Sequence, residues 1–211
     1  RDVERSRGLG DVYKRQISDY EAMKTAGKRA HALGHPIVID PVGVSGSSYR
    51  REKCLELMKI IHPTCIRGNY SEIQALLHNC GTVTGVDAAE DALAEAEETD
   101  LPELMKQYAK ENQMILVASG ETDLITDGSC VYRCHNGSPM MARITGSGCM
   151  STVMLGAFLS AENSVESAVA CCAFTGIAGE LAAKETTAQK RGTMTCLLYT
   201  SPSPRDLSTS R

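Results

Sequence analysis

The stretch Gly146-Ser147-Gly148-Cys149 combines small residues with a thiol at the start of an expected helix. Small residues at a helix start leave backbone N–H groups uncrowded, and the helix dipole adds partial positive charge there. The turn can therefore bind an anion such as a phosphate group, with the Cys149 thiol beside it. A helix cap with a buried thiol explains the same residues, and this short pattern alone leaves both hypotheses open.

Polar side chains follow three expected strands, at residues 37–39, 64–66 and 114–118, where each strand ends. In open α/β sheets, ligands bind beyond the carboxyl ends of the strands, so we expect these side chains to share one site with the glycine turn. In chain order they are Asp40, Arg67, Asn69, Glu72 and Ser119.

The residue types in this set match those that bind magnesium and phosphate. Asp40 and Glu72 could hold Mg²⁺, which prefers oxygen ligands and usually keeps waters and substrate phosphates. Arg67 and Asn69 can reach phosphate oxygens. Ordinary roles are also open: loop cap for Asp40, dipole partner for Glu72, surface cation for Arg67 and N-cap for Asn69. Four polar clusters at one sheet edge favour the functional hypothesis.

The elements that position these residues can be predicted from apolar spacing. Helical spacing predicts helices at about 19–33, 51–61, 71–77, 150–160 and 164–184. A polar stretch from 87 to 110 predicts one or two exposed helices broken near Pro102, and Asp127-Gly128 predicts a hairpin between 124–126 and 131–133. Strands that alternate with helices indicate an α/β fold: a mostly parallel sheet covered on both faces, with the hairpin antiparallel at one edge.

Composition narrows the class of protein. The chain has 211 residues and a formal charge of −4, which disfavours nucleic acid as the main partner. No uninterrupted apolar run approaches ~18 residues, so we expect no membrane span, and no signal peptide is visible at the start. Nine cysteines without a CxxC pair indicate reduced thiols in the cytoplasm more than disulfides or a zinc site.

Two terminal segments look unlike the rest of the chain. Ser6 to Gln16 has no helical or strand periodicity, and neither has Cys196 to Arg211. One coding choice for Asp11 to Gln16 has a reverse complement that encodes Cys196 to Ser201. Our hypothesis is that residues 1–16 and 196–211 are adapter-derived tails and that 17–195 is the genuine part of the protein, a partial domain.

Seven motifs occur along the chain in a fixed order: Asp40-Pro41-Val42-Gly43, Arg67-Gly68-Asn69-Tyr70-Ser71-Glu72-Ile73, Gly85-Val86-Asp87, Ser119-Gly120-Glu121-Thr122-Asp123, Asp127-Gly128, Thr145-Gly146-Ser147-Gly148-Cys149 and Ala178-Gly179-Glu180-Leu181-Ala182. Together they resemble the hydroxyethylthiazole kinases of the ribokinase-like superfamily. The resemblance covers about Ile17 to Thr195. It implies a three-layer αβα fold and an enzyme that uses ATP and Mg²⁺ to phosphorylate the alcohol of 4-methyl-5-(2-hydroxyethyl)thiazole in thiamine salvage.

The resemblance also implies roles for individual residues. Asn69-x-x-Glu72 matches the magnesium and phosphate motif, with Asp40 as the second metal-associated carboxylate. Cys149 stands where most of the superfamily has an aspartate base and the thiazole kinases have a cysteine. The other implied roles are an anion hole at Gly146, Ser147 and Gly148 and a substrate contact at Gly146. ATP contacts are implied at Arg67, Asn69 and Ser119. At the position of Ser119 the family usually has threonine.

This sequence departs from the family pattern at two places. The family's N-terminal portion, with much of the thiazole pocket, has no counterpart, and its late Gly-Pro-Gly-Ser-Phe stretch is only echoed by Arg191 to Met194. The family forms trimers with sites between subunits, so we expect residues 1–211 alone not to turn over the alcohol. Another ribokinase-like kinase, such as a hydroxymethylpyrimidine kinase, and a non-catalytic nucleotide-binding fragment are the alternatives. Cysteine in place of aspartate at position 149 argues against a hydroxymethylpyrimidine kinase.

Overall fold

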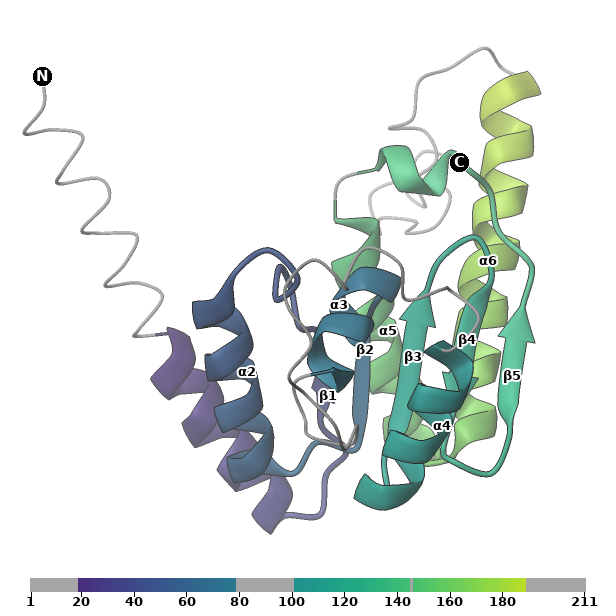
Figure 1. Ribbon diagram of the computed structural model, residues 1–211. Helices are drawn as coiled ribbons and strands as arrows, with labels where there is room; N and C mark the ends of the chain where they lie inside the picture. The colour runs from purple at the N-terminus through teal and green to yellow at the C-terminus, as the bar shows by residue number, and fades with distance from the viewer. Residues whose placement is uncertain (1–18, 79–100, 145, 189–211) are drawn as a thin grey trace, which may run out of the picture.

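A five-stranded sheet forms the centre of the computed structural model, which describes residues 19–78, 101–144 and 146–188 (Figure 1). The first three strands run parallel and the last two continue the sheet as an antiparallel hairpin, as the sequence predicted. The strand order is β1 (Val38–Ile39), β2 (Cys65–Asn69), β3 (Ile115–Ser119), β4 (Asp123–Thr126) and β5 (Val131–Cys134).

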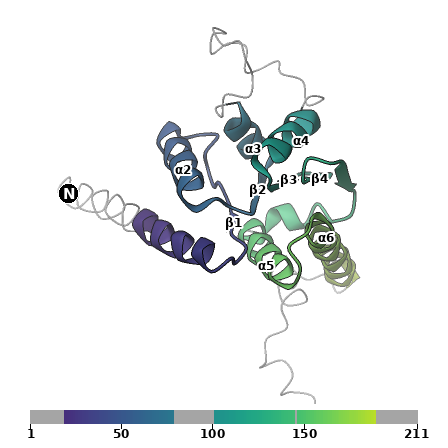
Figure 2. The same ribbon diagram turned by 90° about the horizontal axis from the view of Figure 1, so that it is seen from below.

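Helices cover both faces of this sheet, which confirms the predicted layers for the described residues (Figure 2). One face carries α2 (Ser48–Ile61), α3 (Tyr70–Leu77) and α4 (Leu101–Asn112). The other face carries α5 (Ser147–Ala161) and α6 (Val165–Ala188), and the short 3₁₀ helix η2 (Met141–Arg143) precedes α5. A further helix over residues 19–32 packs beside α2.

Alternate strand residues face two separate hydrophobic clusters, because side chains of a strand point to opposite faces of a sheet. Ile66, Leu116 and Leu124 lie in the cluster on the side of α2, α3 and α4. Their neighbours pack against α5 and α6, where Leu155, Leu159, Ala168 and Cys171 are buried; these neighbours are Cys65, Ile115, Val117 and Ile125.

Helix α4 begins at Leu101, beside the break predicted near Pro102. Pro102 is its second residue and lies in the first turn, where its missing N–H is not needed. The helix differs from the prediction in its exposure, because Leu101, Met105, Tyr108 and Ala109 are buried. Residues 87–100 and the Gly85-Val86-Asp87 motif lie outside the described residues, as do Thr145, Arg191 to Met194 and both proposed tails.

Helix α6 is, by length and composition alone, long and apolar enough over Val165–Thr187 to cross a membrane. The expectation from uninterrupted apolar runs did not single it out. Core packing accounts for only part of its composition. Ala168, Cys171 and Ala182 are buried and the helix contacts β3, β4 and β5, whereas Phe174, Ile177 and Leu181 are exposed. One such helix is weak evidence for a membrane span.

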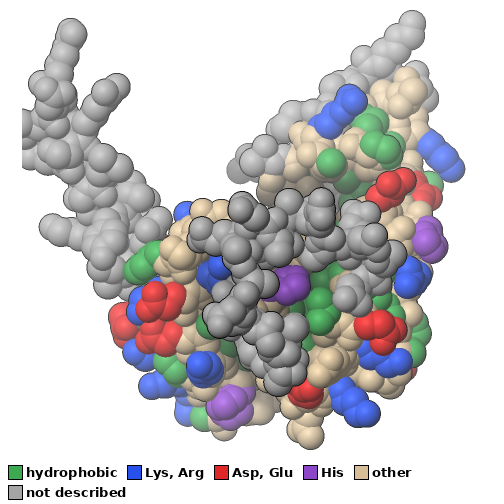
Figure 3. All heavy atoms as spheres, viewed as in Figure 1, with side chains coloured by type: hydrophobic (Ala, Val, Ile, Leu, Met, Phe, Trp, Pro, Cys, Tyr) green, Lys and Arg blue, Asp and Glu red, His purple; other side chains and the backbone are tan. Residues whose placement is uncertain are grey.

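The charged side chains on the face seen in Figure 3 are mixed in sign. Lys, Arg, Asp and Glu lie interspersed on the described part of that face and gather into no single basic patch. This arrangement agrees with the formal charge of −4.

Replacing Gly27 with valine should destabilise the fold. A Cβ at this position would lie 2.6 Å from Cγ2 of Ile61 and 2.9 Å from its Cβ, so the helix over 19–32 could not stay this close to α2. We expect the free energy of unfolding to fall by about 1–3 kcal/mol in urea titrations followed by circular dichroism. Ala26→Val, on the exposed side of the same helix, is the matched control for helix propensity. An equal loss in the free energy of unfolding in both variants would contradict the close packing of Gly27 against Ile61.

Candidate active site

The carboxyl ends of β1, β2 and β3 bring the predicted polar residues to one edge of the sheet. Asn69 is the register partner of Ser119, so the ends of β2 and β3 lie level. Ile39 pairs with Ile66, so Asp40, which follows β1, lies level with Arg67. Arg67 lies inside β2, because this strand continues to Asn69 and does not end at Ile66 as predicted. The two side chains form an ion pair with 4.0 Å between Arg67 Nη1 and Asp40 Oδ2.

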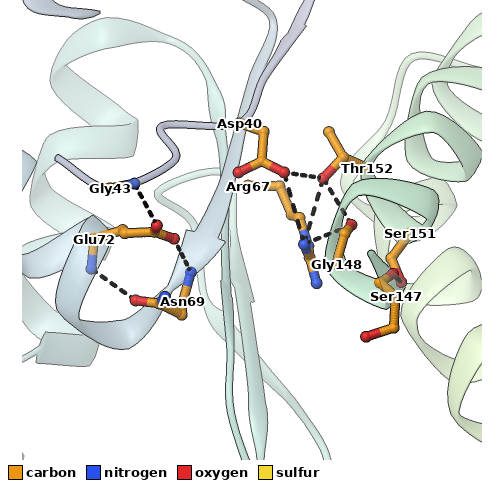
Figure 4. Close-up of polar contacts among 9 residues, drawn as sticks. All are labelled: Asp40, Gly43, Arg67, Asn69, Glu72, Ser147, Gly148, Ser151 and Thr152. Carbon is orange, nitrogen blue, oxygen red and sulfur yellow. Dashed lines mark hydrogen bonds and ion pairs between the residues drawn. The ribbon is translucent and has the colours of Figure 1, made fainter. Parts of the chain in front are cut away.

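The guanidinium of Arg67 also reaches across to the start of α5 (Figure 4). Its Nη1 donates to the carbonyl of Gly148 over 2.8 Å and lies 3.4 Å from the hydroxyl of Thr152. The Thr152 hydroxyl donates in turn to Asp40 Oδ2 over 2.8 Å. These four residues, from β1, β2 and α5, form one network, which we call the Arg67 network.

Asp40 carries an electrostatic cost in this network. Burial raises the pKa of its carboxyl above the usual range, and the nearby Glu72 carboxylate raises it further. The hydrogen bond from Thr152 and the charge of Arg67 act against this rise without cancelling it. Within the described part of the chain only Oδ2 of Asp40 has a partner, so Oδ1 is the oxygen left to contact a ligand.

Asn69 and Glu72 form a second cluster at the start of α3. The Asn69 side chain accepts from the backbone N–H of Glu72 over 2.9 Å, and Glu72 Oε2 accepts from the N–H of Asn69 over 3.0 Å, which is a capping box. Glu72 Oε1 accepts from the N–H of Gly43 over 2.8 Å. The capping role considered for Asn69 is therefore present, and the buried Glu72 carboxylate also fixes the loop that follows Asp40.

The glycine turn is the start of α5 itself. Gly146 is the N-cap with a φ of 88°, a left-handed value that favours glycine, and the helix begins at Ser147, three residues before its predicted start. No described residue accepts a hydrogen bond from the backbone N–H of Gly148 or Cys149. The Cys149 side chain is exposed, which rules out the alternative of a buried thiol.

A cavity of about 760 Å³ lies between the ends of β2 and β3 and the start of α5. Four predicted residues line it: Arg67, Ser119, Ser147 and Gly148. Its volume is in the range that encloses a small-molecule ligand. The other predicted residues lie outside its lining; they are Asp40, Asn69, Glu72, Gly146 and Cys149.

Sequence analysis missed two residues of this site. Thr152 lies four residues after Gly148, one helical turn on, and that spacing was the available signal. Asp123 lines the cavity and accepts from the backbone N–H of Gly120 over 3.1 Å. Burial raises the pKa of the Asp123 carboxyl, which the Gly120 hydrogen bond and Arg67 partly oppose.

Comparison with known proteins identifies a family. Residues 10–200 match the model of the hydroxyethylthiazole kinase family. The hydroxyethylthiazole kinase 1 of Methanosphaera stadtmanae is 37% identical over 198 residues, which are 90% of this chain and 68% of that protein. The hydroxyethylthiazole kinase of Clostridium acetobutylicum is 38% identical over 165 residues, or 77% of this chain and 60% of its own length. The chain thus spans about two thirds or less of these relatives.

Solved structures confirm the ribokinase-like α/β fold. The hydroxyethylthiazole kinase of Pyrococcus horikoshii superposes with a TM-score of 0.69 at 28% identity, covering 85% of this chain and 64% of that structure. An adenosine kinase of Anopheles gambiae superposes with a TM-score of 0.52 at 16% identity, covering 75% of this chain and 45% of its own. The second likeness concerns the fold alone.

Glu72→Gln should destabilise the protein. Both carboxylate oxygens of Glu72 accept from backbone N–H groups, and an amide NH₂ in place of one oxygen would face a donor. We expect a loss of about 1–3 kcal/mol in the free energy of unfolding, measured by urea titration. Glu103→Gln, in the first turn of α4 and exposed, is the control and should change little. A Glu72 variant as stable as its control would show that the two backbone hydrogen bonds to Glu72 contribute nothing to stability.

Asp40→Asn should stabilise the protein at neutral pH. The pKa of Asp40 is raised in the folded state, so folding is opposed once the carboxyl ionises. The advantage of the variant should therefore be largest at neutral pH and shrink as the pH falls through the folded pKa toward the ordinary value of 3.8. Melting temperatures across this pH range are the measurement. Asp127→Asn should show the opposite trend, because hydrogen bonds from Ser129 lower the pKa of Asp127.

Proposed function

This chain belongs to the hydroxyethylthiazole kinase family, and from that membership we propose that it carries the phosphoryl-transfer site of an ATP-dependent thiazole kinase. The acceptor is the primary alcohol of 4-methyl-5-(2-hydroxyethyl)thiazole, and the reaction serves thiamine salvage. The observation that best supports the proposal is the Arg67 network, which joins the sheet edge to the glycine turn beside a cavity of about 760 Å³.

Phosphoryl transfer depends mainly on positioning and on neutralising charge, because its transition state is loose. The proposed anion hole is the start of α5, from Gly146 to Cys149. The backbone N–H of Ser147 already donates to the carbonyl of Ile144 over 3.2 Å, so the N–H groups of Gly148 and Cys149 are the donors left for the transferring phosphoryl group. Arg67 and Ser119 line the cavity and contact the nucleotide, and Asn69 adds a polar contact at the edge of the sheet. Gly146, which has no side chain to obstruct the turn, also borders the alcohol.

The carboxylates at the sheet edge fit a magnesium ion. Asp40 offers Oδ1, which has no partner among the described residues, and Glu72 retains lone pairs beyond its two backbone bonds. No group of three His, Cys, Asp or Glu side chains that could hold a metal occurs in the described ranges. Two carboxylates plus waters and substrate phosphates are the usual surroundings of Mg²⁺. When bound, the ion neutralises phosphate charge.

Cys149 is the proposed catalytic base. Its side chain is exposed at the start of α5, next to the N–H groups that hold the phosphoryl group. A base contributes modestly to this reaction, because the alcohol keeps its proton until late in the transfer. Cytoplasmic localisation, which the cysteine usage indicates, and a homotrimer, which the family resemblance implies, complete the proposal.

The proposal is tested by product formation from ATP and the thiazole alcohol. Since this chain spans about two thirds or less of its relatives, the assay uses residues 17–195 joined to the N-terminal portion of a family member. We expect ATP-dependent formation of the thiazole phosphate, with residues 1–211 alone inactive. A preference for hydroxymethylpyrimidine would favour the other kinase, and nucleotide binding without any product would favour a non-catalytic role.

Cys149→Ala should lower kcat more than it raises the KM for ATP. Removing a positioned base costs about 10²–10⁴-fold in rate. Cys149→Asp should keep activity, since a carboxylate can accept the same proton. Steady-state kinetics of the joined protein are the measurement, with Cys130→Ala, an exposed thiol in the hairpin turn, as control. An unchanged rate in Cys149→Ala would exclude the catalytic role.

A further inference from the structure

Thr152 forms side-chain hydrogen bonds that differ from those of Ser151 and Ser160 on the same helix. Ser151 and Ser160 each donate to the carbonyl four residues earlier, over 2.9 and 2.7 Å, as hydroxyls in helices commonly do. The corresponding carbonyl for Thr152 is that of Gly148, 3.1 Å away, but Arg67 Nη1 already donates to it over 2.8 Å.

The single proton of the Thr152 hydroxyl therefore has a better acceptor. Asp40 Oδ2 lies 2.8 Å away and is charged, which makes the stronger bond. The hydroxyl oxygen remains free to accept from Arg67 Nη1 at 3.4 Å. Thr152 thus donates to the anion and faces the cation of the same ion pair.

We propose that Thr152 is a positioning residue that holds Asp40 and Arg67 apart and keeps Arg67 on the carbonyl of Gly148. This inference rests on the proposed function, because it concerns how the nucleotide site is arranged. Without the hydroxyl, Asp40 Oδ2 would keep only the ion pair at 4.0 Å, within the described ranges. The partly buried carboxylate would then attract the guanidinium and draw it away from α5.

The position of Arg67 matters because the nitrogen atoms of its guanidinium other than Nη1 are available to a ligand in the cavity. Only Nη1 bonds to the protein in the part of the chain that the structure describes, and Arg67 lines the 760 Å³ cavity beside Ser119. The donors on Nε and Nη2 are therefore the ones available to phosphate oxygens. Among the described residues, the hydrogen bonds of the Thr152 side chain reach the cavity lining at Arg67 and Gly148, so its hydroxyl acts on the nucleotide through them.

The test measures ATP binding to the 211-residue chain by calorimetry in EDTA, where neither metal nor turnover contributes. Thr152→Val keeps the shape and removes the hydroxyl, and it should weaken binding about tenfold, the loss of one charge-assisted hydrogen bond. Thr152→Ser restores the hydroxyl and should restore affinity. Ser160→Ala removes a hydroxyl that bonds only to its own helix and should bind ATP like the unmodified chain.

A double-variant cycle separates positioning from a general loss of structure. In an Arg67→Ala background, Thr152→Val should have no further effect on ATP affinity, because its effect passes through Arg67. The same tenfold loss in both backgrounds would overturn the inference. The free energies of unfolding of Thr152→Val, Asp40→Asn and their double variant, measured in urea, should also be non-additive. Additive changes in free energy would contradict the coupling between Thr152 and Asp40. An unmodified chain that binds no ATP would contradict the proposed function instead, while the unfolding cycle still decides on Thr152.

Discussion

The hydrogen bond from Arg67 to the carbonyl of Gly148 is the contact on which the site depends. It joins residues 81 positions apart in sequence and connects strand β2 to the first turn of α5. A helix start can serve as an anion site only if something fixes it relative to the other phosphate contacts. Because the same guanidinium lines the cavity, the fold uses one cation both to anchor the helix and to present charge.

Much of the fold could be predicted from the sequence because its signals are local. Three buried strands, the Asp127-Gly128 hairpin and the helices follow from apolar spacing and turn residues. Two features differ from the prediction. Residues 147–149 are helical although their glycine and serine content indicated a turn, and α4 is partly buried although its polar composition indicated an exposed helix.

The sequence predicts that these polar residues share one edge of the sheet, but not which of them line the cavity or bond to each other. Asp40, Arg67, Asn69 and Ser119 lie together because strand ends meet at one sheet edge, a rule that requires no side-chain detail. Which side chains bond to each other depends on rotamers and on competition for acceptors, and the sequence does not specify these. Thr152 was missed for that reason: its role depends on Arg67 already occupying the Gly148 carbonyl.

The two carboxylates of the site have different duties, and the difference follows from their surroundings. Glu72 has both oxygens on backbone N–H groups, so it mainly holds the chain in place. Asp40 follows a strand of only two residues, so the sheet alone fixes it weakly. It is held instead from both layers of helices: from α3 by Glu72, through Gly43 in the next loop, and from α5 by Thr152. A raised pKa is the cost of burying Asp40 there, and its Oδ1 is left without a partner among the described residues. A carboxylate held from two sides with one open oxygen suits a ligand that must be bound at a fixed distance from the start of α5.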